Sequence, residues 1–384
     1  MNRLLKGSVS LPGSKSESNR ALMIAAYGGF PLDVDGLSDA HDTVLLKTLL
    51  EQSSLRGASA TKQSIIDCED AGTVARFMLT YLANKTGIWQ LTGTERLCQR
   101  PMAPLIDALR HLGADIVGDT LPLRITGKPI KGGSVTLDAS QSSQFASSLL
   151  LAAPTWEQGL QLTLKGNPVS MPYLEMTIKM MEYYGIQVIR EDNTITVPHQ
   201  SYQPRPFVVS PDWSAASYWY EMMALSDGGE VLLKGLRPDS LQGDAVVAEW
   251  FNTLGVLTTF EPEGARLTKT MTKPQDLVFD FTDTPDLFPA VCATCAALGV
   301  DAVFKGTATL SAKESDRLNA LKAELSHLGE KRVFCTYGDH RIAMALASLW
   351  PKYGPIEVDD LSVVNKSYPS FWKEMKRHFD GYTP

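Results

Sequence analysis

Apolar residues gather along the chain in six stretches that are hydrophobic on nearly every side of a helix. Each stretch opens with small or polar residues and then turns apolar, and together they cover residues 18–26, 71–83, 142–154, 212–225, 286–299 and 339–350. A helix that is apolar all round is enclosed by protein on all sides. The pattern therefore predicts six buried helices.

A second, amphipathic helix is expected about thirty residues after each of these starts. These helices begin near Leu45, Pro104, Tyr173, Ala245, Arg317 and Tyr368. Four of them end on a glycine, where φ can turn positive, and these are Gly113, Gly185, Gly255 and Gly329. Short runs of β-branched residues between the helices, such as 186–189 and 207–209, predict strands. The chain thus contains six similar units of strands and paired helices.

Six units that each enclose a helix do not fit a thin solenoid, in which a repeat contacts only its neighbours. Two compact groups of three units, with helices packed inside sheets, fit better, and the fold class is α/β. A doubly wound sheet with an added domain is the alternative. That fold favours a Gly-rich turn after an early strand, and the sequence contains neither G-x-G-x-x-G nor a Walker A motif.

Composition narrows the functional classes. The 384 residues are 44% hydrophobic and 21% charged, which excludes a disordered chain or a coiled-coil rod. Net charge is -7 with Lys and Arg scattered, so a nucleic-acid or anionic-membrane surface is not expected. The sequence has no apolar run long enough to span a bilayer and no apolar core of a signal peptide near its start. We expect a cytoplasmic location.

Five cysteines, an odd number, argue against a disulfide framework. Cys292 and Cys295 share a helix face within an apolar stretch, and no second ligand pair follows them. A buried structural pair is therefore favoured over a redox or metal site.

The chemistry is expected where the buried helices begin, because free N–H groups and the positive end of the helix dipole favour anions there. Residues 11–20, LPGSKSESNR, place hydroxyls, a Lys and an Arg around the first such N-terminus. Alone, this cluster indicates either an anion site or an exposed helix cap.

An ordered set of motifs, spread from end to end of the chain, resembles the signatures of the 5-enolpyruvylshikimate-3-phosphate synthase family. The matching segments are residues 12–22, 71–76, 100–101, 142–145, 170–173, 313–318 and 339–344. The resemblance implies two inside-out α/β barrel domains, each of three strand-helix-strand-helix-strand units with buried helices. It also implies domain boundaries at 14–210 and at 1–13 with 211–384, and an active site in the cleft between the domains.

The same resemblance implies a reaction. The family transfers the enolpyruvyl group of phosphoenolpyruvate to the 5-hydroxyl of shikimate 3-phosphate and releases phosphate, in the shikimate pathway to chorismate and the aromatic amino acids. It uses no metal and no organic cofactor. By this resemblance Asp286 accepts the hydroxyl proton, Glu314 protonates C3 of the enol phosphate, and Lys15 lies between both substrates. The expected partners are these two small anions alone, and a monomer is expected.

The resemblance assigns two further sets of residues to substrate binding. The phosphoenolpyruvate set is Lys15, Gly72, Arg100, Gln144, Arg317, Arg341 and Lys366. The shikimate 3-phosphate set is Lys15, Ser16, Arg20, Ser142, Ser143, Gln144, Ser170, Tyr173, Asp286 and Lys313. Forked guanidinium groups suit carboxylates and phosphates. The herbicide glyphosate occupies the phosphoenolpyruvate position in this family, and the small Gly72 predicts sensitivity to it.

Two departures from the family pattern stand out. Asp70 replaces the usual Asn before Ala71-Gly72-Thr73 and adds negative charge near an anion-binding loop. The connection from Gly329 to Tyr337 is too short for the strand pair expected there, since Asp286 and His340 are 54 residues apart where Ser214 and Asp286 are 72 apart. Either a strand pair is absent from this unit or residues are missing from the sequence.

Two rival functions were considered. The sister enolpyruvyl transferase that acts on UDP-N-acetylglucosamine has Lys-Asn after its opening glycine and uses a loop cysteine as an acid. Here Lys15 is followed by Ser16 and Arg20, and Cys98 has the wrong spacing to Arg100 for that role. The second rival is an inactive relative that binds anions, and the intact set of charged motif residues argues against it.

Overall fold

The computed structural model describes residues 3–56, 64–271, 277–379 and 382. The chain divides into two compact units. The N-terminal unit comprises Lys15–Leu37 and Asp42–Val209, and the C-terminal unit comprises Met1–Ser14, Ser38–His41 and Ser210–Pro384. Each unit is described below by itself.

The N-terminal unit is built around three buried helices that pack against one another, α1 (Lys15–Gly28), α3 (Gly72–Asn84) and α6 (Ser143–Ala152). The amphipathic helices are α2 (His41–Arg56), α5 (Ala103–His111) and α7 (Met171–Tyr183), with a short α4 (Glu95–Cys98). One four-stranded sheet has the order β2 (Ser64–Asp67), β3 (Gly87–Thr92), β5 (Leu123–Gly127) and β4 (Asp115–Val117). The other has the order β6 (Gly133–Asp138), β7 (Leu160–Lys165), β9 (Thr194–Val197) and β8 (Ile189–Glu191).

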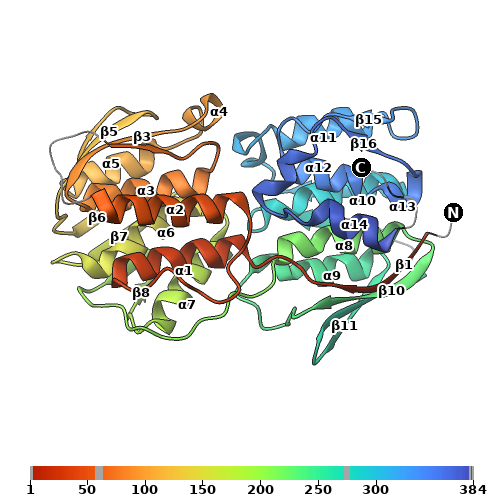
Figure 1. Ribbon diagram of the computed structural model, residues 1–384, viewed down its shortest axis with the longest axis horizontal. Coiled ribbons are helices and arrows are strands. Elements are labelled where there is room, and N and C mark those ends of the chain that lie inside the picture. Colours follow the sequence, from red (N-terminus) through yellow and green to blue (C-terminus); the bar gives the residue numbers. More distant parts are fainter. Residues whose placement is uncertain (1–2, 57–63, 272–276, 380–381, 383–384) are drawn as a thin grey trace. The chain divides into compact units, whose positions relative to one another are not determined.

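The C-terminal unit repeats this plan with α8 (Trp213–Leu225), α10 (Phe288–Leu298) and α12 (His340–Ala347) as its mutually packed inner helices (Figure 1). Every residue of α8 and of α12 is buried. The amphipathic helices are α9 (Val247–Thr253), α11 (Arg317–Leu325) and α14 (Phe371–His378), with a short α13 (Trp350–Tyr353). The prediction of six buried helices is confirmed, and so is the α/β fold class.

The sheets of the C-terminal unit differ in size. The largest has the order β1 (Leu4–Val9), β10 (Gly228–Lys234), β12 (Gly264–Lys269) and β11 (Val256–Glu261). Two further sheets hold two strands each within the described ranges, β13 (Leu277–Asp280) with β14 (Ala302–Lys305), and β15 (Val333–Phe334) with β16 (Glu357–Val358). Strand β1 pairs in parallel with β10, so the start of the chain completes the sheet of this unit (Figure 1).

The short connection after α11 holds no strand pair. Residues 326–330 form turns, and residues 331–332 lead directly into β15 of the next unit. The buried carboxylate of Glu324 stabilises this path, because it accepts hydrogen bonds from Lys331 Nζ at 2.6 Å, Tyr337 Oη at 3.0 Å and the backbone N of Cys335 at 3.1 Å. Both explanations of the short connection stay open.

The predicted helix ends are confirmed, but two of the predicted strands are not. The four helix-ending glycines have positive φ, between 86° and 94°, as expected. The strands predicted at 186–189 and 207–209 are wrong, since β8 begins only at Ile189 and Val208 makes a single isolated bridge. The backbone N–H of Gln187 bonds instead to a side-chain oxygen of Gln200, which replaces a ladder bond.

Candidate active site

The predicted site residues of the N-terminal unit lie at the N-termini of its helices. Lys15 and Ser16 open α1, Gly72 opens α3, Ser143 opens α6, and Ser170 precedes α7. Ser142 caps α6 by accepting a hydrogen bond from the backbone N–H of Gln144 at 3.2 Å. Ser170 has φ 57°, in the left-handed region. These starts present backbone N–H groups and hydroxyls, which are suited to phosphate.

Two arginines and a glutamine surround Gly72. Arg76 Nη1 donates to Gln144 Oε1 at 2.9 Å, and Gln144 Nε2 donates to Thr73 Oγ1 at 3.0 Å. A Cβ at position 72 would stand 2.6 Å from Arg76 Nη1 and 2.7 Å from Arg100 Nη1. Any larger residue would therefore displace the two guanidinium groups from their present positions at the start of α3. We call Gly72, Arg76, Arg100 and Gln144 the N-terminal cation cluster.

Arg20 has a supporting position. Its guanidinium donates to Thr177 Oγ1 at 2.7 Å, to the carbonyl of Ser16 at 3.0 Å and to the carbonyl of Tyr173 at 2.9 Å, and its side chain is buried. Burial lowers the pKa of Arg20 to about 10, with the charges of Tyr173 and Glu17 opposing that change. The guanidinium thus fixes α1 against α7, and holds Ser16 and Tyr173 in place.

Lys15 forms an ion pair that the sequence did not predict. Its Nζ lies 3.0 Å from Oδ2 of Asp42, which is buried near the start of α2. The ammonium is thereby held at the beginning of α1 with 16% of the side chain exposed. No local pattern marks Asp42, because the two residues are 27 positions apart.

The predicted site residues of the C-terminal unit form one ionic network centred on Arg317. This guanidinium, 1% exposed, bonds to Asp286 at 3.0 Å, Glu314 at 2.8 Å and Asp339 at 2.9 Å. Arg341 Nη2 lies 2.7 Å from the other oxygen of Asp286, and Lys313 Nζ lies 3.8 Å from Asp286. The structure therefore brings both proposed proton carriers onto the same arginine. We call these residues the Arg317 network.

The charges of the network set the protonation of Asp286. Burial alone would raise the pKa of this carboxyl, but Arg341, Lys313 and Arg317 outweigh burial and hold the pKa well below its ordinary range. Burial likewise acts to lower the pKa of Arg317, and the carboxylates of Asp339, Glu314 and Asp286 outweigh it and raise that pKa. Asp286 is thus ionised, and can accept a hydrogen bond from a hydroxyl.

Two buried residues beside this network were missed from the sequence. Asp244, in the 3-10 turn before α9, bonds to the hydroxyl of Ser214 and leaves Oδ1 without a hydrogen-bond partner. Burial raises the pKa of Asp244 to about 7, and the charge of Asp286 adds to the rise. Tyr218 of α8 is fully buried close to Arg341 and Arg317. Neither residue belongs to a motif that could have drawn attention to it.

Lys366 and the cysteines are the remaining residues singled out from the sequence. Lys366 ends the 3-10 turn before α14 and is 6% exposed. Cys98 ends α4, where its thiol bonds to the carbonyl of Gly93. Cys292 and Cys295 lie on α10 as expected, although Cys292 is only half-buried, and burial raises both thiol pKa values to about 12. In the described part of the chain no group of three or more His, Cys, Asp or Glu side chains is placed to bind a metal ion.

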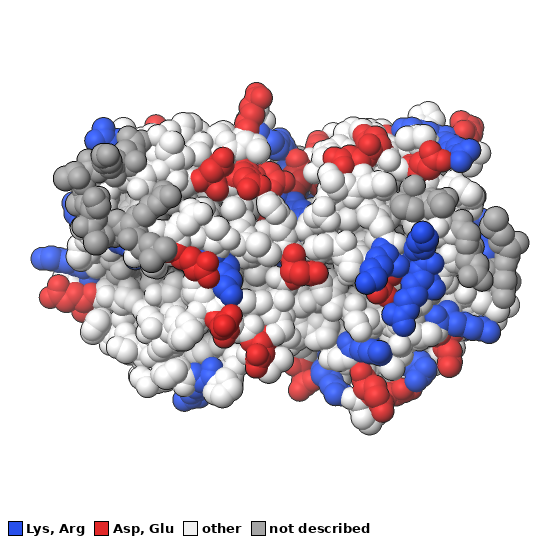
Figure 2. All heavy atoms as spheres, in the orientation of Figure 1, with Lys and Arg blue, Asp and Glu red and all other residues white. Residues whose placement is uncertain are grey.

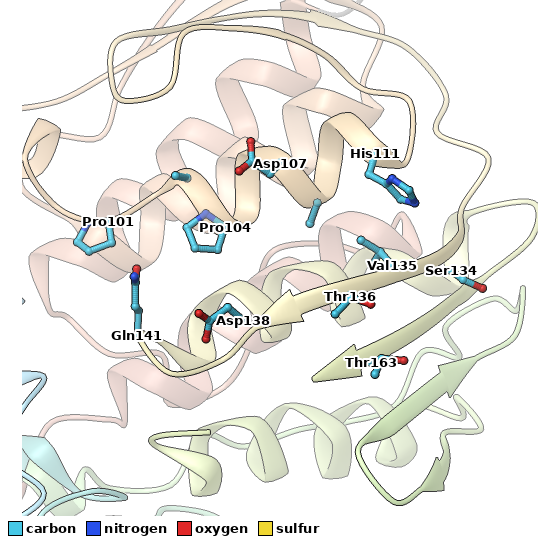
Figure 3. A pocket seen from close by; sticks show the side chains of 12 residues that line it. Pro101, Pro104, Asp107, His111, Ser134, Val135, Thr136, Asp138, Gln141 and Thr163 are labelled. Carbon is cyan, nitrogen blue, oxygen red and sulfur yellow. The ribbon is translucent and has the colours of Figure 1, made fainter. Parts of the chain in front are cut away.

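A groove of about 640 Å³ lies between α5 and β6 (Figure 3). Asp107 and His111 line it from the helix, and Thr136 and Asp138 line it from the strand. None of the predicted site residues lines this groove, and its carboxylates would repel anionic substrates. Acidic and basic side chains are interspersed on the face shown in Figure 2, with a basic group over α14. Among the described residues no helix is long and apolar enough to cross a membrane.

Comparison with solved structures identifies the fold. EPSP synthase from Acinetobacter baumannii superposes with a TM-score of 0.75, over 98% of this chain and 96% of that one, at 22% identity. The chain therefore has the two-domain inside-out α/β fold of the enolpyruvyl transferases.

Sequence comparison identifies the family. The model described as "EPSP synthase (3-phosphoshikimate 1-carboxyvinyltransferase)" matches residues 2–375, and this chain belongs to that family. A 3-phosphoshikimate 1-carboxyvinyltransferase from Bacteroides fragilis is 40% identical over 97% of this chain and 95% of the relative. One from Syntrophobacter fumaroxidans is 35% identical over 97% of each. The first alignment extends over 400 positions, more than the 384 residues here, so that relative has residues without a counterpart in this chain.

Proposed function

We propose that this chain transfers the enolpyruvyl group of phosphoenolpyruvate to the 5-hydroxyl of shikimate 3-phosphate and releases phosphate. Membership of the family gives the reaction class. One observation carries the assignment: each unit places arginines at helix starts, and in the C-terminal unit the ionised Asp286 and the carboxyl of Glu314 lie against them. Two polyanionic substrates and two proton transfers need these groups.

The cations bind phosphoenolpyruvate in this proposal. Arg100, Gln144 and the backbone at Gly72 act from the N-terminal cation cluster, and Lys15 acts beside them. Arg317, Arg341 and Lys366 act from the C-terminal unit. Because the arginines of both units are needed, we propose that the two units are the two functional domains, that the site lies in the cleft between them, and that the units close on the substrates. Like charges keep the empty site open until the anions neutralise them.

In this proposal shikimate 3-phosphate binds at the helix N-termini of the N-terminal unit, which are rich in hydroxyl groups. Ser16, Ser142, Ser143, Ser170 and Tyr173 stand at or next to the starts of α1, α6 and α7, where N–H groups and hydroxyls can bind a phosphate and a polyol together. Lys313 and Asp286 contribute from the C-terminal unit. Arg20 fixes the positions of Ser16 and Tyr173 by donating hydrogen bonds to their carbonyl oxygens.

Proton transfer follows from the Arg317 network. The 5-oxygen attacks C2 of phosphoenolpyruvate and gives its proton to Asp286, while Glu314 protonates C3. The C2–O bond to phosphate then breaks, Asp286 gives its proton to the departing phosphate, and Glu314 takes a proton from C3, which restores the double bond and both carboxyls. Asp286 held by Arg317 and Arg341 is a weak base. Glu314 also bonds to Arg317, at 2.8 Å. Arriving phosphate and carboxylate groups compete for both arginines, so substrate binding itself frees the two carboxyls for proton transfer.

Phosphate release is the direct test. The purified chain should release phosphate from phosphoenolpyruvate with shikimate 3-phosphate and not with UDP-N-acetylglucosamine. Release only with the nucleotide sugar, or with neither acceptor, would overturn the proposal. Scattering profiles that contract when both substrates are added would support closure, and unchanged profiles would contradict it. A cytoplasmic location and activity of a single chain stay predictions that accompany this function.

A further inference from the structure

Strand β14 has a strand on one edge only. It pairs in parallel with β13, from Leu277 opposite Ala302 to Asp280 opposite Lys305. Its counterparts β3, β7 and β10 each pair in the same way with one strand, and each also pairs on the other edge with an antiparallel strand, namely β5, β9 or β12. The strand pair absent after α11 is the one that would have covered this edge. Among the described residues no strand does so.

The side chains of β14 show the effect of this missing cover. Ala302 and Phe304 face the core but are only half-buried, although Phe304 stacks with Phe279 at a centroid distance of 6.3 Å. On the outer face Val303 is 56% exposed and lies opposite Val278, which is 55% exposed. A half-exposed phenylalanine next to free backbone N–H and C=O groups is a template for another strand.

The sequence of this edge is complementary to itself. Antiparallel pairing of two copies about Val303 places Asp301 of one opposite Lys305 of the other, and this occurs twice. The same register places Val303 opposite Val303 on the outer face, and Ala302 opposite Phe304 on the inner face. Opposite charges and a small residue against a large one are the cross-strand pairs that favour association.

We propose that β14 is a self-association surface, through which two copies of this chain form a weak, reversible dimer. The two-stranded sheets join into one four-stranded sheet of order β13, β14, β14 and β13, which matches the strand number of the other large sheets. A two-fold axis at Val303 makes the contact closed, so it gives dimers and not fibres. The short edge makes a small interface, which is why the dimer is weak. This departs from the expected monomer.

Charge exchange between two variants provides the test. D301K places Lys opposite Lys in its own dimer, and K305E places Glu opposite Asp. Sedimentation velocity from about 5 µM to about 500 µM should show the native chain dimerising, and each variant dimerising roughly 10-fold more weakly or worse. An equal mixture of the two variants should dimerise as well as the native chain, because Lys then faces Asp or Glu at every pair. The double variant D301K/K305E should also recover.

Lys305 lies opposite Asp280 within the sheet, so K305E could also disturb the pairing of β13 with β14 in a single chain. A second pair of variants avoids this problem. V303K and V303D change a residue that is already exposed, and each should abolish dimerisation alone and restore it when mixed. Far-ultraviolet circular dichroism checks that all variants fold. The proposal would be overturned if the native chain stayed monomeric throughout the concentration range, or if the mixtures associated no better than their components. Lys305 would then be a charged residue that prevents pairing at this edge. Enzyme activity does not enter this test, so its outcome is independent of the proposed function.

Discussion

Glu221 is predicted to reduce the stability of the C-terminal unit at neutral pH. Its side chain is fully buried in α8, and neither carboxyl oxygen has a hydrogen-bond partner. Burial raises the pKa of this group well above its ordinary value of 4.5. The folded unit therefore keeps Glu221 protonated at a pH where the unfolded chain ionises it.

The magnitude follows from proton linkage. Below about pH 4.5 both states are protonated, and the group costs nothing through its charge. Above that pH the folded state binds one more proton than the unfolded state, so the free energy of unfolding falls by about 1.4 kcal/mol per pH unit until the pH reaches the raised pKa. E221Q removes this dependence. The variant should match the native chain near pH 4.5, and its advantage should grow with each pH unit above that value until the raised pKa is reached.

Urea unfolding at several pH values between about 4.5 and 7.5 measures this difference. E324Q is the matched control, because Glu324 is also buried but accepts bonds from Lys331, Tyr337 and a backbone N–H. That variant should lose stability throughout this pH range, because the amide gives up the ionic bond from Lys331. A difference between E221Q and the native chain that stays constant with pH, or an E221Q chain that is less stable at pH 7, would refute the reasoning.

Three further predictions concern catalysis. E314Q keeps the size of the side chain but cannot supply a proton, so turnover should fall by about 100-fold while both substrates still bind, and near-normal turnover would remove Glu314 as the acid. G72A forces its Cβ against two guanidinium groups, so the KM for phosphoenolpyruvate should rise and competitive inhibition by glyphosate should weaken; an unchanged inhibition constant would contradict the placement. D244N should remove a titration near pH 7 from the profile of kcat/KM, since the native pKa is raised to about 7 by burial and by Asp286; a superimposable profile would exclude this role.

Much of the fold could be read from the sequence because the inner helices are apolar all round. A continuous run of apolar residues can be recognised from the local sequence alone. In α8 and α12 every residue is buried, so no exposed face interrupts the run with polar residues. The strands are short and leave weaker signals. Residues 186–188 join no sheet, because Ile186 packs into the core while the neighbouring N–H of Gln187 bonds to a side chain.

The candidate site was predictable only where it coincides with helix starts. Lys15, Gly72 and Arg341 stand there, and their motifs are contiguous in sequence. The carboxylates that form ion pairs with these residues are distant in the chain. Asp42 is 27 residues from Lys15, and Asp286 is 55 residues from Arg341. Such pairs depend on how the helices pack, and nothing in either local sequence specifies them.

The parallel pairing of β1 with β10 gives the order of events during synthesis. Leu4 lies opposite Gly228, so β1 waits for a partner that is made 224 residues later. At about 5–20 residues per second this wait lasts roughly 10–45 s, during which the whole N-terminal unit emerges. That unit draws no strand from beyond Val209 and can fold in the interval. The second unit is therefore completed only when β10 has been made, and β1 reaches its native partner no earlier than that.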